Sequence, residues 1–169
     1  IMPSLVGSEM CIRDSIQLIK KTPTNLEAHA SLANAYVVLS RLYQTNGSEA
    51  LSKENKEKLI ASTQKAIEEF KIIDYYSPND PWVHAQLASC FNDLEMYKEE
   101  IESYELILRL CPDDKQILFR LGILYFQQGH NAKGLKIYER LKELKFSRSE
   151  DLIDFYDANI KQEYYVSSL

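Results

Sequence analysis

The fold is decided by residues 115–148, KQILFRLGILYFQQGHNAKGLKIYERLKELKFSR. Apolar side chains recur there at helical spacing in two runs, over 118–125 and over 135–144, which predicts two amphipathic helices. Between them lies a turn at 128–130 that contains a glycine. The stretch therefore predicts one antiparallel pair of helices.

The preceding stretch, residues 81–114, repeats this plan at an offset of 34 positions. A first apolar run is followed by a polar break near 92–96, and Pro112 stops the second run. A fixed period in apolar, small and helix-ending residues is typical of a stacked array of helix pairs. The residues that match at this offset are Pro78 and Pro112, Leu87 and Leu121, Ala88 and Gly122, Phe91 and Tyr125, and Tyr104 and Tyr138.

An earlier unit, residues 26–80, aligns with the later ones once an insertion of 21 residues is allowed between Tyr36 and Ala66, since the offset there is 55 instead of 34. Helical spacing continues on both sides of the turn signal at 46–48. We therefore expect two extended helices that project about one to two turns beyond the neighbouring pairs, at 1.5 Å per residue.

The two ends of the chain carry separate predictions. Residues 15–25 are interpreted as the stump of a truncated repeat, and residues 149–169 as a capping helix with an acidic first turn. Residues 3–14 resemble translated sequencing-adapter read-through, so residues 1–14 are interpreted as non-native and excluded from the fold argument. The native protein would then extend further upstream. A short signal peptide or a natural helix start is the alternative for this segment.

The repeat pattern resembles the tetratricopeptide repeat, in which W-x2-L-G-x2-Y is followed by Ala, an aromatic residue and Pro within 34 residues. The run Leu121-Gly122-Ile123-Leu124-Tyr125 matches the centre of that motif without a gap. The resemblance covers roughly residues 15–148 and implies an all-α fold, a right-handed superhelical array of antiparallel helix pairs. The departures are His84 and Leu118 for Trp, Glu100 and Gly134 for the second-helix Ala, and Phe146 for Pro.

Composition and charge argue against several classes of function. The net charge of −5 without a basic stripe disfavours a nucleic-acid partner, and no apolar run reaches the length of a membrane span. Cys11, Cys90 and Cys111 have no metal-ligand spacing and favour a reducing compartment, the cytoplasm among them. Nucleotide-binding and catalytic motifs are absent from the sequence, so we expect no cofactor, no metal and no enzyme activity.

The titratable residues have structural interpretations. His29 and His84 are equivalent positions of successive repeats, so the repeat explains both. The acidic pairs at 68–69 and 99–100 fit solvated helix faces.

In the tetratricopeptide family, one face of each first helix lines a concave surface that takes peptides. Phe119 and Ile123 beside Arg120 would suit an acidic or carboxyl-terminal peptide with an apolar residue nearby, although Arg120 could instead pair with an acidic neighbour such as Asp93. By register, the groove residues here are Asn34, Val37, Val38, Gln86, Ser89, Asp93, Phe119, Arg120, Ile123 and Gln127.

One subfamily clamps the terminal carboxylate of heat-shock chaperones with Lys, Asn and Arg on this face. Asn34 and Arg120 match, but Ala30 and Gln116 stand where the lysines belong, which argues against such a clamp. The sequence thus favours a scaffold that binds a protein or peptide. The alternatives are a regulatory or targeting module of a larger enzyme and a self-associating structural array.

Overall fold

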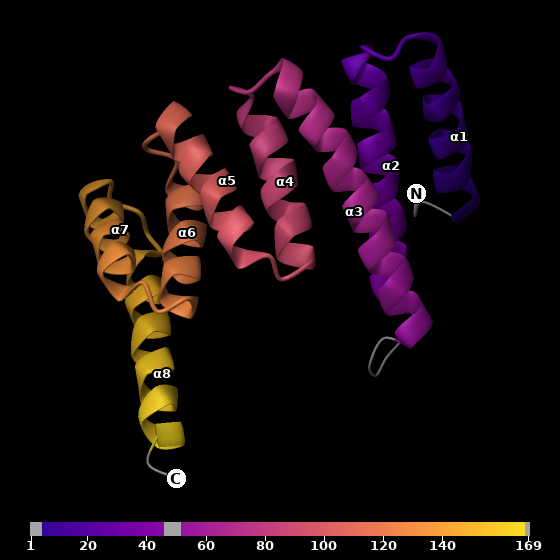
Figure 1. Cartoon of the computed structure of the whole chain (residues 1–169). Coiled ribbons are helices and arrows are strands. Elements are labelled where there is room, and N and C mark those ends of the chain that lie inside the picture. Colours follow the sequence, from indigo (N-terminus) through magenta and orange to yellow (C-terminus); the bar gives the residue numbers. More distant parts are fainter. Residues whose placement is uncertain (1–4, 46–51, 168–169) are drawn as a thin grey trace. The chain divides into compact units, whose positions relative to one another are not determined.

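The computed structural model describes residues 5–45 and 52–167. These residues form eight α-helices and no strand (Figure 1). The turn expected at 46–48 lies outside the described residues. The helices are α1 (Leu5–Lys21), α2 (Leu26–Thr45), α3 (Lys53–Tyr76), α4 (Pro81–Asp93), α5 (Tyr97–Leu110), α6 (Lys115–Gln127), α7 (Asn131–Glu143) and α8 (Ser149–Ser167).

The helices fall into two compact units, with the boundary between Met96 and Tyr97. The first unit contains α1 to α4. Its α2 and α3 lie side by side and are 20 and 24 residues long, against 13 for α4 (Figure 1). Their apolar faces and that of α4 enclose one core, made of Ala33, Val37, Ala66, Ile67, Phe70, Ile73, Val83, Leu87, Cys90 and Phe91.

Helix α1 packs against α2 and begins at Leu5, before the start at Ser15 that the sequence predicts. It therefore runs through residues interpreted as non-native. Whether those residues are native stays a prediction.

The second unit is built around α6, which contacts α5, α7 and α8. Glycines let these helices approach closely. A Cβ on Gly122 would lie 2.7 Å from Cδ2 of Leu152 and 3.1 Å from Cγ2 of Ile137, and a Cβ on Gly134 would meet the ring of Phe126. The core consists of Leu118, Phe119, Leu121, Tyr125, Phe126, Ile137, Leu141 and Leu152.

Helices α4 and α6 begin with the same cap in successive repeats. The Asp80 carboxylate accepts a hydrogen bond from the Trp82 amide at 2.9 Å, and Asp114 accepts from the amides of Gln116 and Ile117 at 3.0 Å. Each cap pairs first-turn amides that would otherwise lack an acceptor.

Helices α4, α6 and α7 end in a shared geometry as well. A residue with positive φ follows each helix: Glu95 (57°), Gly129 (71°) and Lys145 (52°). The next amide then bonds the carbonyl five residues back, at 2.9, 2.7 and 3.0 Å respectively. This is the Schellman arrangement, in which only glycine avoids the penalty of a Cβ.

Candidate functional site: exposed helix faces of the repeats

Three of the predicted groove residues lie on α2 in the first unit. Asn34 is exposed and Val38 is half-buried, and both line an open cleft of about 550 Å³ between α1 and α2. Val37 is buried in the core and is therefore not accessible to a ligand.

The other three residues of the first unit, Gln86, Ser89 and Asp93, lie on α4 and are each partly exposed. Burial raises the pKa of Asp93, and the nearby Arg41 opposes that shift. The carboxylate of Asp93 thus has a cation of its own unit, from α2, as a neighbour.

The four groove residues of the second unit lie on α6. Arg120 and Gln127 are exposed and Ile123 is half-buried. Phe119, predicted as an apolar anchor, retains only 7% exposure because Phe146 and Arg148 cover its ring. The expectation of an accessible ring at this position is corrected: the aromatic side chain belongs to the core.

Arg148 is a residue of this surface that the sequence argument missed. Its guanidinium lies 4.5 Å from the centre of the Phe119 ring, and its Nε donates to Asp151 at 2.9 Å. Both partners of that ion pair are more than half exposed. On the same unit, a hydrogen bond from Arg120 opposes the rise in the pKa of Tyr104, which burial and then Glu100 cause.

The two equivalent histidines serve the repeat in the same way. Nε2 of His29 lies 2.9 Å from the Pro23 carbonyl, and Nε2 of His84 lies 2.9 Å from the Pro78 carbonyl. Each histidine therefore ties the start of its helix to the turn before it. This agrees with the structural interpretation of both residues.

His29 makes a second contact, since its Nδ1 lies 2.5 Å from Oε2 of Glu69 on α3. A carbonyl and an ionised carboxylate only accept, so the ring satisfies both as a cation that donates from both nitrogens. Although burial lowers it, the hydrogen bonds to Glu69 and Pro23 raise the pKa of His29 above its ordinary value. The carboxylate that faces Nδ1 of His84 comes from a different repeat position, Asp74, and its Oδ1 is further away, at 3.7 Å.

Two acidic residues do not lie on solvated helix faces as the sequence predicted. Glu69 contacts His29, and Glu100 is fully buried. Glu100 stands at the position of the family's small second-helix residue, where Ala66 of the earlier pair is also fully buried. Helix packing at that position, not the charge pattern, decides the burial.

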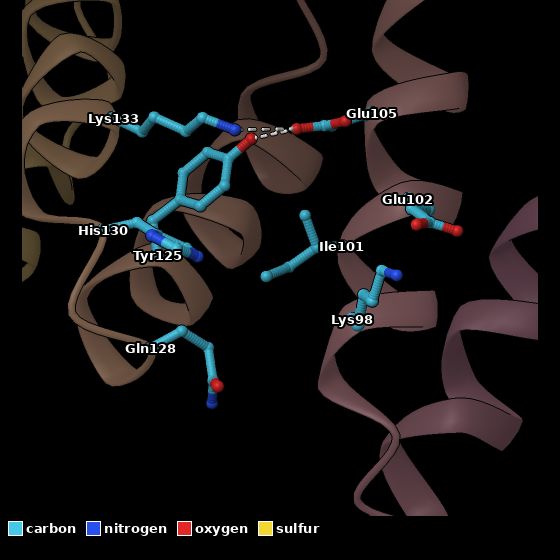
Figure 2. Close-up of a pocket in the computed structure, with 8 residues that line it drawn as sticks. All are labelled: Lys98, Ile101, Glu102, Glu105, Tyr125, Gln128, His130 and Lys133. Atoms are coloured by element: carbon cyan, nitrogen blue, oxygen red, sulfur yellow. Dashed lines mark hydrogen bonds and ion pairs between the residues drawn. The ribbon is translucent and has the colours of Figure 1, made fainter.

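A polar pocket of about 250 Å³ lies between α5, α6 and α7 (Figure 2). Figure 2 shows Tyr125 and Lys133 reaching toward Glu105 across it. The Tyr125 hydroxyl donates to Glu105, and Lys133 Nζ lies 3.6 Å from the same carboxylate and 5.0 Å from the Tyr125 ring centre. These contacts join three helices, so we assign the cluster to the packing of the repeat.

Within the part of the chain that the structure describes, no group of three or more His, Cys, Asp or Glu residues could hold a metal ion. Cys90 is buried, and burial, with Asp93 second, raises the pKa of its thiol to about 12. It behaves as a core residue. Among the same described residues, no helix combines the length and apolar character that crossing a membrane requires.

The fold is thus that of an all-α protein made of antiparallel helix pairs. A model of the tetratricopeptide repeat family matches residues 83–114 and 115–148. These two segments of the chain are therefore tetratricopeptide repeats. Such repeats generally serve as scaffolds for protein interaction, so a protein is the class of partner that the family implies.

Two solved structures are similar in fold. The crystal structure of MamA has a TM-score of 0.62 at 16% identity, over 96% of this chain and 92% of that chain. The crystal structure of TTC0263, a thermophilic TPR protein of Thermus thermophilus, has a TM-score of 0.57 at 22% identity, over 88% of this chain and 71% of that chain. Identities this low support the fold alone. No curated protein matches the sequence.

Proposed function

We propose that this chain is an interaction scaffold that binds an acidic or carboxyl-terminal peptide segment of a partner protein on the α6 face of its second unit. Arg120, Ile123 and Gln127 follow one another at intervals of three and four residues, so they lie along one side of the helix. A cation, a half-buried aliphatic side chain and an amide in a row suit an extended or helical peptide.

The observation that carries this proposal is the position of Arg148 over the Phe119 ring. We propose that Arg148, which lies on the side chain preceding Arg120 in the sequence, acts together with Arg120 in pairing with the ligand. Guanidinium groups pair bidentately with carboxylates, which supports an acidic ligand. The ion pair of Arg148 with Asp151 is exposed and of little energetic value, so a ligand carboxylate can replace Asp151.

For the first unit by itself, we propose that a peptide bound there makes polar contacts with Asn34 on α2 and with Gln86 and Ser89 on α4, which are at least partly exposed. Val37 and Phe119 act from beneath the surface by holding their helices in place, since both side chains are buried.

The test is a fluorescence anisotropy titration with a labelled hexapeptide that ends in Leu-Asp-Asp with a free carboxylate. The double variant Arg120→Ala with Arg148→Ala should weaken binding by about tenfold or more, as expected for loss of charge-assisted hydrogen bonds. Lys136→Ala, an exposed cation on α7, is the matched control and should change little. Equal affinity of the double variant, or equal binding of a peptide that ends in Leu-Lys-Lys, would contradict the proposal.

A further inference from the structure

Helix α3 ends differently from α1 and α5, which are the equivalent helices of the neighbouring repeats. Helix α1 carries Lys20 and Lys21 in its last turn, whereas α3 has no basic residue in its last turn. In the second unit, α5 carries Arg109 at the corresponding place. Cations at this end offset the partial negative charge of the last carbonyls. Helix α3 therefore lacks a compensation that both α1 and α5 have.

Two exposed tyrosines occupy the end of α3 instead. Tyr75 is 79% exposed and Tyr76 is 52% exposed, and their rings meet edge to face with centres 5.2 Å apart. At the offsets of 55 and 34, Tyr75 corresponds to Lys20 and Arg109. The repeat framework thus functions without an aromatic residue at this position, so packing does not explain these rings.

A third aromatic residue lies on the other side of the turn, at the start of α4. Trp82 is 43% exposed and packs edge-on against Phe70 of α3, with ring centres 5.8 Å apart. Its equivalents in the other repeats are Glu27 and Gln116, so this ring is also particular to one corner. Residues 77–81 line an open cleft of about 440 Å³ at the same turn.

Carboxylates lie on both sides of the turn at this corner. Residues 72–82, from the last part of α3 to the start of α4, include no Lys and no Arg, and their acidic residues are Asp74 and Asp80. Asp80 caps α4, and the Asp74 side chain is about one-third exposed, at 35%. Exposed aromatic faces, carboxylates and an uncompensated helix C-terminus all attract a cation.

We propose that this aromatic corner, formed by Tyr75, Tyr76, Asp80 and Trp82, binds an arginine side chain within a basic segment of a partner protein. The guanidinium stacks on an exposed ring while the carboxylate and the carbonyls at the end of α3 receive its N–H groups. The partner supplies the cation that Lys20 and Arg109 supply at the ends of α1 and α5. This site is separate from the α6 face, so either proposal can fail without the other.

The full chain offers an intrinsic probe, since Trp82 is its one tryptophan. Hexa-arginine added to the chain should change the fluorescence of Trp82 and saturate, while hexa-glutamate should leave it unchanged. Tyr75→Ser combined with Tyr76→Ser should weaken the hexa-arginine affinity about fivefold or more, from the loss of two exposed cation–π contacts. Circular dichroism would verify that this variant keeps its helices.

A matched pair of substitutions separates the corner from the overall negative charge. Asp80→Asn and Asp114→Asn each remove one charge and keep a side chain that caps helices equally well. Asp80→Asn should weaken binding about threefold, and Asp114→Asn, its equivalent 34 residues later, should not. The proposal is overturned by equal effects of the two variants, by unchanged affinity in the tyrosine variant, or by no response of Trp82 to hexa-arginine.

Discussion

The close helix approach at Gly122 in the second unit makes a quantitative prediction. Replacing Gly122 by leucine inserts four carbons where α6 meets α7 and α8. The first of these, Cβ, already lies 2.7 Å from Cδ2 of Leu152, well inside the 3.5–4.0 Å at which carbon atoms attract. Leu152 is fully buried, so its side chain has no open space into which to move.

The magnitude follows from two opposing effects. Overpacking of a well-filled core costs about 1–3 kcal/mol. Removing a glycine from a helix interior returns about 0.5–1 kcal/mol, because the unfolded chain loses conformational freedom. For Gly122→Leu the clash dominates, and we expect a net loss of about 1–2 kcal/mol. In a chain of this length that lowers the melting temperature by about 2–8 °C.

The assay is a double-mutant cycle measured by urea unfolding and circular dichroism. Leu152→Ala removes the methyl groups that clash and should cost about 2–5 kcal/mol on its own. Combined with Gly122→Leu, the loss should be smaller than the sum of the two by about 0.5–3 kcal/mol. Gln116→Leu, exposed on the same helix, is the control and should change stability little. Strict additivity, or no loss in Gly122→Leu, would refute the packing assigned to α6 and α8.

Three further predictions concern stability. The pKa of His29 is raised above its ordinary value of 6.5, so its contribution to the free energy of unfolding is fully present below that pH and is lost as pH rises through the folded pKa. Glu69→Gln, whose neutral amide can donate to the ring, should therefore flatten the fall in melting temperature between pH 6 and 9. Parallel curves of melting temperature against pH for the two proteins would count against the cationic pair. Both Glu95 and Gly129 have positive φ, so Glu95→Gly should stabilise the chain by about 1 kcal/mol and Gly129→Ala should destabilise it by a similar amount. Thermal melts in which Gly129→Ala is the more stable variant would contradict this. Removal of residues 1–14 should shift the melting temperature by less than about 4 °C, since most described side chains of that part of α1 are exposed; a larger drop would argue that the segment is native.

Helix type and packing partners were largely predictable, because both follow from periodicity. The stripe through Leu121 and Tyr125 identified the buried face of α6, and the small residue Gly122 marked the helix crossing. The positive φ at Gly129 was likewise implied by a glycine in the turn. At Glu95 the same turn is made without glycine, and there the sequence carried no local signal.

Which charged side chains are buried was less predictable, because a charge pattern indicates only that a residue prefers solvent. It does not indicate whether helix packing leaves the residue exposed. The acidic pair at 99–100 predicts a solvated side chain at Glu100, whereas the repeat register places Glu100 at the position of Ala66 and Gly134. Register gives the correct burial for all three. The contact of His29 with Pro23 could also have been predicted, since His84 and Pro78 reproduce the same spacing of six residues.

Contacts between side chains far apart in the sequence could not be predicted from the sequence pattern. No periodic signal links Arg148 to Phe119, since the guanidinium reaches back over a ring 29 positions earlier (148 − 119). The convergence of Tyr125 and Lys133 on Glu105 likewise depends on how three helices pack. Such contacts decide which predicted groove residues are accessible and which are covered.

Comparison between repeats of one chain helps to distinguish residues that maintain the framework from residues that face a partner. A residue that recurs with the same contact is explained by the fold: His29 and His84 each bond the carbonyl of the preceding proline. Arg120, by contrast, corresponds to Gln86 and to Ser31, so the framework does not require a cation there. Exposure without recurrence is therefore the criterion that selects Arg120 on α6, and it selects the rings at the end of α3 by the same reasoning. Because a stacked array repeats its packing but has no reason to repeat its ligand contacts, this criterion needs only the chain itself.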